Sequence, residues 1–242
     1  KTFKLNNVNA GMGIYSISID REKFKRNKTI HYSDISEENL SAYSFTATDY
    51  KFVPKPELPT IINQVSPILR SQIGGPDGFF FGDLRLSLDT EVIISRNLTL
   101  TSNLSYGLAN NYDNLDLPSN SILPRVRTDI VEYMKMGDKF TIDHLQANYF
   151  SKPYKDLYYK FSVGYFEQMF GGFGGEILYR PFMKNYGIGA ELWRVRQREY
   201  KMLLGFRDYE TTTGHINLYY LHPKSQKLVA SWNVLQGGPD FS

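Results

Sequence analysis

The sequence predicts an all-β protein, an antiparallel meander of about ten to twelve strands, on three observations. Aromatic residues make up 15% of the 242 residues, a share that suits strands. Apolar and polar residues alternate with period two over residues 83–108. The connections between strand-like runs, such as residues 135–138 and 183–185, are short, and no long helical pattern interrupts them.

The clearest strand pair is a predicted hairpin over residues 83–108. Leu84, Leu86 and Leu88 alternate with polar residues, and the alternation resumes after a turn-like segment at 95–97. A soluble sandwich would bury the leucine face, whereas a membrane barrel would turn the leucines to lipid and the charges to the lumen. Alternation alone favours the sandwich, because soluble β-proteins are far commoner.

Ten further runs are predicted strands. They are residues 11–20, 40–52, 126–134, 140–150, 156–170, 175–182, 186–200, 202–209, 213–222 and 228–234. The connections between them alternate between tight turns and longer polar loops, of which residues 110–124 are the clearest example. Such an alternation is typical of a barrel.

Residues 54–78 break the strand pattern. Thr60 is a candidate cap for a short helical turn that Pro67 would interrupt. We expect an irregular connecting segment here, with a plug folded into or over a barrel mouth as the sharper alternative. The predicted organisation is therefore a strand region of uncertain assignment (1–53), the irregular or plug-like segment (54–78) and an antiparallel β-barrel region (79–242).

Composition excludes several classes of protein. A net charge of +3 is too mild to favour nucleic acid as a partner. Cysteine is absent, which excludes disulfides and cysteine-based metal sites. No apolar run approaches the roughly 18 residues of a transmembrane helix. The mean hydropathy of −0.39 is typical of a soluble protein, yet a transmembrane barrel also averages to a polar mean, because its lipid-facing and lumen-facing residues alternate.

The densest charge lies within residues 186–200. Arg194, Arg196 and Arg198 are spaced two apart, so one strand face would carry all three guanidiniums. The apolar positions slip at Trp193, which predicts a bulge that keeps the arginines off the apolar face. Such a ladder suits an anionic polymer, because guanidinium binds carboxylate in a bidentate fork, while the alternative is a ladder paired with acids on neighbouring strands. The candidate glycan-binding or lumen-charge residues are Glu167, Glu176, Arg180, Glu191, Arg194, Arg196, Arg198, Arg207 and Asp208.

Eight tyrosines admit two interpretations, namely Tyr154, Tyr158, Tyr159, Tyr165, Tyr179, Tyr186, Tyr219 and Tyr220. Their rings are candidate platforms for stacking of sugars, whose C–H surfaces are apolar. The alternative, which the composition favours, is an interfacial girdle or core packing.

Motifs for catalysis are absent. The four histidines show no metal-ligand spacing, and the sequence has neither a GxSxG motif nor a Walker loop. Residues 171–175 are glycine-rich, but no helix follows them to form a phosphate site, so they predict a hairpin turn. Glu167 and Glu176 are a conceivable glycosidase pair, although any chain with 25 acidic residues offers such pairs. We expect no catalytic residue, no metal and no cofactor.

Several stretches carry a family resemblance, in order, over most of residues 64–222. They are QVSP at 64–67 running into LR at 69–70, IGGPDGFFF at 73–81, NYD at 111–113, LPRVRTDI at 123–130, GYFEQMFGGFGGEILYRPF at 164–182, VRQREY at 195–200 and GFRDYETTTGHINLYY at 205–220. These sequence stretches resemble the YjbH/GfcD-type family of exopolysaccharide- and capsule-associated outer-membrane proteins. Residues 1–50 show only generic strand character.

The resemblance implies an outer-membrane β-barrel of the Gram-negative cell envelope that supports exopolysaccharide or capsule biosynthesis or export, without catalytic activity. The implied partners are outer-membrane lipid, the surface polysaccharide and other exopolysaccharide operon proteins in the periplasm. A charged lumen would then guide an anionic glycan. The family has further strands beyond residues 215–220, so we expect a fragment whose barrel is incompletely closed.

Two other functions remain as alternatives. One is a barrel-borne hydrolase that modifies glycans. The other is a structural module that docks periplasmic export partners through loops such as 54–78 and 110–124.

Overall fold

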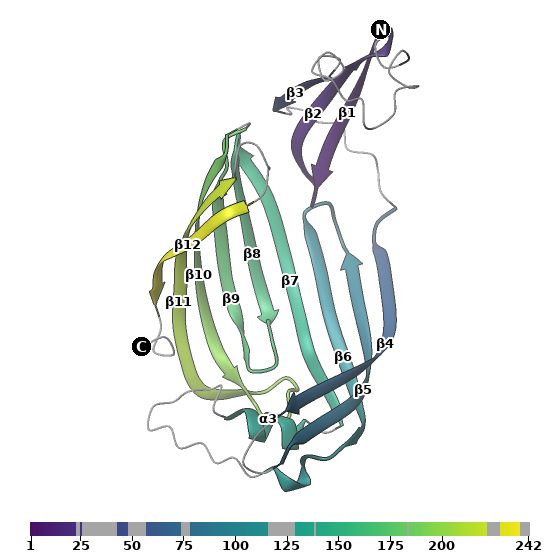
Figure 1. Cartoon of the computed structure of the whole chain (residues 1–242), viewed down its shortest axis with the longest axis vertical. Helices are drawn as coiled ribbons and strands as arrows, with labels where there is room; N and C mark the ends of the chain where they lie inside the picture. The colour runs from purple at the N-terminus through teal and green to yellow at the C-terminus, as the bar shows by residue number, and fades with distance from the viewer. Residues whose placement is uncertain are drawn as a thin grey trace.

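The computed structural model describes residues 1–22, 25, 43–47, 57–73, 78–115, 129–137, 139–182, 184–221 and 228–237. Their strands form two antiparallel sheets (Figure 1). The small sheet has the order β1-β2-β3, with β1 at Thr2–Asn9, β2 at Met12–Asp20 and β3 at Tyr43–Ala47. The predicted strand region at the start of the chain is thus a sheet of its own.

The large sheet is a nine-stranded meander in which every strand pairs with its neighbours in sequence. Its strands are β4 (Thr60–Ile73), β5 (Phe80–Ile93), β6 (Leu98–Asn110), β7 (Phe140–Tyr154), β8 (Leu157–Tyr165), β9 (Phe170–Tyr179), β10 (Tyr186–Arg198), β11 (Phe206–Leu221) and β12 (Leu228–Gly237). The predicted all-β antiparallel meander is confirmed, including the hairpin over residues 83–108. Within the described residues β4 and β12 are edges that do not pair with each other, so the sheet is not closed.

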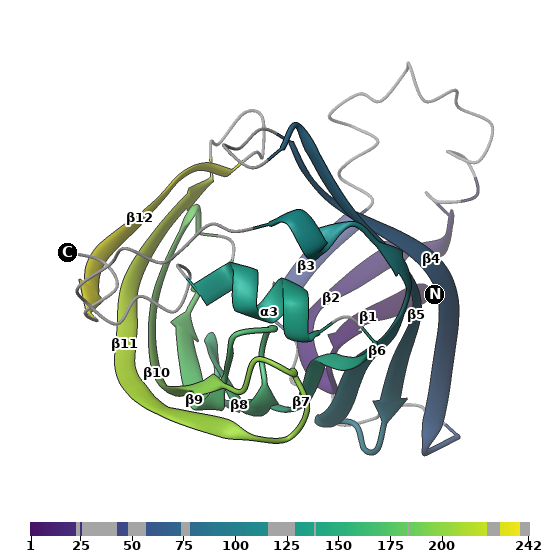
Figure 2. The same cartoon turned by 90° about the horizontal axis from the view of Figure 1, so that it is seen from below.

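The large sheet is strongly curled (Figure 2). Two short helical elements lie at the end of this sheet that is lower in Figure 1. The 3-10 turn η2 spans Tyr112–Asn114 and the helix α3 spans Ile130–Met136. No helix in the described ranges is long and apolar enough to cross a membrane. Seen along the curl, α3 occupies its interior.

The curled sheet buries its polar face and exposes its apolar face. On β5, Asp83, Arg85 and Ser87 are buried, whereas the intervening Leu84 and Leu86 are 41% and 45% exposed. The same holds on β8, where Ser162 is buried between exposed apolar neighbours. The leucines of the hairpin therefore face outward, which is the opposite of what the sandwich alternative requires.

The buried apolar residues gather in two small clusters at the α3 end of the interior. The first contains Phe81, Tyr112, Leu115 and Val131, and the second contains Tyr133 and Met202 with Met169, Phe170, Tyr200 and Tyr209 packed against it. A strand was predicted over residues 126–134. This was wrong for the described residues of that range, because residues 130–134 belong to the helix α3. A segment inside the curl finds no free strand edge there, so its backbone satisfies its own hydrogen bonds as a helix.

Residues 54–78 were predicted to be irregular, and this was wrong for residues 60–73. They form the 14-residue strand β4, which pairs with β5 without a break from Thr60 to Ile73. Pro67 is tolerated because β4 is an edge strand, whose backbone has a ladder partner on one side only. Thr60 caps no helix, and its hydroxyl donates to the carbonyl oxygen of Glu57 at 2.6 Å.

The glycine-rich run at residues 171–175 is not the predicted turn but part of β9. The turn lies at residues 166–169, where the N–H groups of Phe166 and Glu167 donate to the carbonyl oxygen of Phe170 at 3.0 and 3.2 Å. The glycines serve close packing instead. At Gly172, with φ of +158°, a Cβ atom would lie 2.1 Å from the backbone oxygen of Arg194.

Gly174 gives the first testable prediction. A Cβ atom there would lie 2.2 Å from Cε3 of Trp193, and that indole packs edge-on against Phe166. We expect Gly174→Ala to lower the free energy of unfolding by about 1–3 kcal/mol, the usual effect of overpacking. The matched control is Gly175→Ala, where the nearest atom to a Cβ is 3.4 Å away. Urea unfolding followed by tryptophan fluorescence measures both, and equal stability of the two variants would contradict the packing argument.

Candidate functional site

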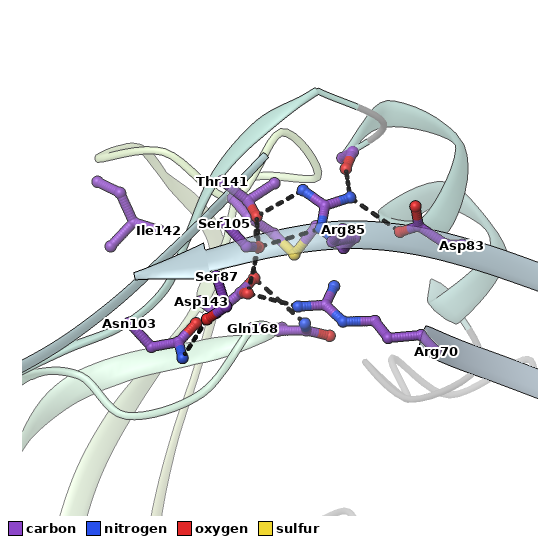
Figure 3. Close-up of polar contacts among 12 residues, drawn as sticks. Arg70, Asp83, Arg85, Ser87, Asn103, Ser105, Thr141, Ile142, Asp143 and Gln168 are labelled. Atoms are coloured by element: carbon purple, nitrogen blue, oxygen red, sulfur yellow. Dashed lines mark hydrogen bonds and ion pairs between the residues drawn. The ribbon is translucent and has the colours of Figure 1, made fainter. Parts of the chain in front are cut away.

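The centre of the polar interior is the guanidinium of Arg85, which is fully buried (Figure 3). It donates to Oδ2 of Asp83 (2.8 Å), Oγ of Ser105 (3.0 Å), Oγ1 of Thr141 (3.0 Å) and the carbonyl oxygens of Gly137 (2.8 Å) and Lys139 (2.7 Å). All five guanidinium N–H groups are therefore used. Since Gly137 and Lys139 follow α3, Arg85 also ties the C-terminal end of that helix to β5.

Asp143 is the second centre of this network (Figure 3). Its carboxylate accepts hydrogen bonds from Ser105 at 2.5 Å and Thr141 at 2.9 Å, and it forms an ion pair with Arg70 of β4. A register shift between β6 and β7 pairs His144 with one residue of β6 and Ile142 with the next, which leaves Asp143 as the extra residue. The network thus joins four consecutive strands, and its two acids balance its two arginines.

A cavity of about 190 Å³ lies between this network and α3. Arg70, Asp83 and Gln168 line it together with residues of the helix. The Oδ1 atom of Asp83 is buried and has no hydrogen-bond partner among the described residues. On the side of Arg70, Asp83 and Gln168 this cavity has room for ordered water, which would satisfy that oxygen.

Arg198 is the other fully buried arginine. Its guanidinium donates to the carbonyl oxygens of Glu167 (2.7 Å), Ile142 (2.7 Å), Met202 (2.9 Å) and Leu203 (3.0 Å), and it lies 4.5 Å from the centre of the Tyr165 ring. The hydroxyl of Tyr133 on α3 donates to the backbone oxygen of Arg198 at 2.7 Å. Burial raises the pKa of Tyr133 to about 12, so this hydroxyl stays protonated at neutral pH. Arg198 therefore holds residues 199–205 against the helix.

A row of ionisable side chains crosses the inner face from β8 to β11. Strand pairing places Lys160 opposite Glu176, Glu176 opposite Glu191, and Glu191 opposite His215. Nζ of Lys160 lies 2.8 Å from Oε1 of Glu176, and Nδ1 of His215 lies 2.6 Å from Oε1 of Glu191. We call these four residues the inner charged row. Within the described ranges, no group of three or more His, Asp or Glu side chains is arranged to hold a metal ion.

The prediction that Arg194, Arg196 and Arg198 share one strand face was wrong. Pairing of β10 with both neighbours is unbroken through Arg196, so Arg194 and Arg196 share the exposed outer face with Leu192. There Arg194 pairs with Glu210, and Arg196 lies 3.8 Å from Asp208. The predicted bulge falls later, between Arg196 and Arg198, and it turns Arg198 inward.

The structure distributes the other candidate residues over three places. Glu176 and Glu191 belong to the inner charged row. Glu167 is exposed in the turn between β8 and β9, and Arg207 lies at the start of β11 with its guanidinium 4.2 Å from the centre of the Tyr200 ring. Arg180 follows β9 at the opposite end of the sheet. Glu167 and Glu176 do not form a pair, so this geometry lends the hydrolase alternative no support.

Sequence reasoning missed six polar residues of the site. They are Arg70, Asp83, Arg85, Asp143, Lys160 and His215. The signal was present for Asp83 and Arg85, which form the polar phase of the predicted hairpin. For Arg70 and Asp143 no local pattern exists, because an edge strand and a bulge bring them together.

The fold and its interior define a class: a curled antiparallel meander with a polar inner face and an apolar outer face. The chain belongs to the YjbH family, since the family model described as "Exopolysaccharide biosynthesis protein YbjH" matches residues 1–233. It is 35% identical over 178 residues to the "Uncharacterized lipoprotein YjbH" of Escherichia coli (strain K12), an alignment that covers 71% of this chain and 25% of that protein. The chain thus spans about a quarter of the length of this relative. No solved structure matches. The family resemblance seen in the sequence is confirmed.

Proposed function

We propose that this chain is part of an outer-membrane β-barrel that supports exopolysaccharide biosynthesis or export without catalysing a reaction. The observation that carries the proposal is that the large sheet has its polar face inside and its apolar face outside, the reverse of a soluble β-protein. Full exposure of a large apolar side chain to water costs about 1.5–3 kcal/mol, and a soluble monomer rarely exposes a large continuous apolar patch. Lipid against the outer face removes this cost.

The dimensions of the outer face support the same proposal. From Leu84 to Ile94 the chain advances ten residues, about 33 Å at roughly 3.3 Å per residue. With a strand tilt of about 40°, this gives a height near 25 Å, which is the apolar band of an outer-membrane barrel. Leu84, Leu86 and Leu88 of β5 face outward in this stretch, and Ile94, which follows the end of β5, is also exposed.

Exposed aromatic residues lie toward both ends of the outer face. Tyr186 and Tyr220 are direct cross-strand partners near one end, where Tyr179 is also exposed. Tyr106 and Phe140 are partners near the α3 end. Girdles of this kind are typical of the two membrane interfaces, so these tyrosines are better explained as a girdle than as sugar platforms.

The interior supports a role as a polar surface for a hydrophilic chain. The inner charged row is only partly buried, and its cation and acids are already paired in the resting protein. A passing anionic glycan would exchange hydrogen bonds with this wall. The E. coli relative is named a lipoprotein, which supports a location in the cell envelope.

The test of this function is secretion after loss of one positive charge on either face. We expect Lys160→Gln to reduce the release of an anionic polysaccharide by roughly fivefold, which corresponds to about 1 kcal/mol of lost Coulomb attraction. The control is Arg196→Gln, which removes one positive charge from the outer face and is expected to leave release unchanged. Secreted polysaccharide is quantified at equal amounts of protein in the membrane. Equal release from both variants would remove the inner charged row from the mechanism.

A further inference from the structure

A cavity of about 570 Å³ lies where the small sheet meets the ends of β8, β9 and β11. Its wall includes Asn7, Tyr15, Asp156, Tyr158, Arg180 and Lys184. A second cavity of about 260 Å³ shares Arg180 and Lys184 with it and extends to Gly187 and Tyr219. Cavities of roughly 300–1,000 Å³ with aromatic walls and a few polar groups are typical of sites for small ligands.

The charges of this wall favour an anion. Arg180 and Lys184 are both exposed, and no carboxylate of the described residues forms an ion pair with either. The position of Arg180 is set by the backbone, because its N–H donates to the carbonyl oxygen of Asp156 at 2.8 Å. Two cations thus stand beside a single acid. A guanidinium binds carboxylate in a bidentate fork, and the ammonium adds a second positive charge.

The uncharged part of the wall suits a sugar. Tyr158 and Tyr219 offer ring surfaces to its apolar C–H face, and Asn185 offers both donor and acceptor groups to its hydroxyls. Lys152 lies 5.4 Å from the centre of the Tyr158 ring, which places a further cation near this platform.

Two glycines lie on the inner face of β10 between the second cavity and the inner charged row. Gly187 and Gly189 are buried on the inner face of β10, four and two residues before Glu191. A Cβ atom at Gly187 would meet its nearest neighbour at 3.5 Å, and one at Gly189 at 3.4 Å, which are ordinary contacts. No close approach of the backbone requires glycine at these positions. The side chains of Leu178 and Tyr219 lie against these glycines, 3.5–3.7 Å from where a Cβ atom would stand.

We propose that these two adjoining cavities bind an acidic saccharide segment, with its carboxylate on the shared Arg180 and Lys184 and its rings against Tyr158 in the larger cavity and Tyr219 in the smaller one. The site lies at the end of the large sheet opposite α3. The inference rests on the proposed function in one respect, namely that the ligand is a unit of the polysaccharide.

The experiment is calorimetric titration of the full-length protein in detergent with two probes. One is a tetrasaccharide of alternating glucose and glucuronic acid, and the other is the neutral tetrasaccharide of glucose. We expect the acidic probe alone to bind, with affinity reduced at least about tenfold by Arg180→Gln, the usual effect of losing a charged hydrogen bond. The control Lys201→Gln, at an exposed position in the loop at the α3 end, should bind as the unaltered protein does.

A second variant tests the space itself. Gly187→Leu places a side chain in the second cavity, where its Cβ atom makes only ordinary contacts, and unfolding measured in parallel shows that the variant is folded. We expect it to abolish binding of the acidic probe. Equal binding of both probes, displacement of the acidic probe by an equal concentration of inorganic phosphate, or full binding by Arg180→Gln or Gly187→Leu would overturn the proposal. Because binding is measured on purified protein, its failure leaves the membrane assignment standing, and failure of that assignment leaves the binding result standing.

Discussion

Arg85→Met is expected to lower the free energy of unfolding by about 3–5 kcal/mol, the effect of removing one partner from a buried ion pair. The substitution leaves the carboxylate of Asp83 buried without its cation. It also frees the carbonyl oxygens of Gly137 and Lys139, which hold the end of α3. Urea unfolding of the protein refolded in lipid, followed by tryptophan fluorescence, measures the loss.

Three companion variants identify the cause of this loss. Arg85→Lys keeps the charge but offers one ammonium in place of a five-donor fork, so an intermediate loss is expected. Arg70→Met should cost less, because the side chain of Arg70 is 28% exposed and water screens its pair with Asp143. Adding Asp83→Leu to Arg85→Met removes the stranded acid and should restore part of the stability. A loss below about 1 kcal/mol for Arg85→Met would show that water, and not the network, satisfies these groups.

Leu88→Arg is expected to impair membrane assembly more than any other change on the outer face. Leu88 lies near the middle of the stretch from Leu84 to Ile94, and arginine at the bilayer midplane of a barrel costs about 2–4 kcal/mol. The matched control is Leu108→Arg near the end of β6, where the expected cost is about 0–1 kcal/mol. The measurements are the amount of protein in washed outer membranes and unfolding in lipid vesicles.

The difference between these two positions tests lipid contact itself. A water-exposed face would tolerate arginine equally well at both. If another protein covered this face, arginine would weaken that contact to a similar extent at both positions. Equal effects at Leu88 and Leu108 would therefore contradict the membrane assignment, whereas a gradient from the middle to the end would support it.

The hairpin over residues 83–108 shows how far local pattern reaches. Period two assigned Leu84, Leu86 and Leu88 to one face and Asp83 and Arg85 to the other, and the structure agrees. Which face is inside does not follow from alternation, because a sheet can curl toward either of its faces. Here the inner side is the one whose arginine and acids satisfy one another.

The errors have a common physical origin in non-local context. Pro67 argued against a strand, but an edge strand tolerates it because one side of its backbone is unpaired. The local sequence at residues 171–175 predicts a turn. Glycine is needed at Gly172 and Gly174 because the backbone of Arg194 and the ring of Trp193, both on β10, lie close to them. The bulge that separates Arg198 from Arg196 depends on how β11 begins after the inward loop at 199–205.

The sequence by itself determined the all-β meander, most strand positions and membership of the YjbH family, because these depend on residue order and on side-chain alternation along single strands. The tertiary structure alone decided which face is buried, that α3 occupies the interior, and that Arg85 and Arg198 are its anchors. The reason is that burial and pairing of charges depend on strands brought together by curvature. Arg70 meets Asp143 across 73 positions of the chain, a distance over which no local pattern carries information.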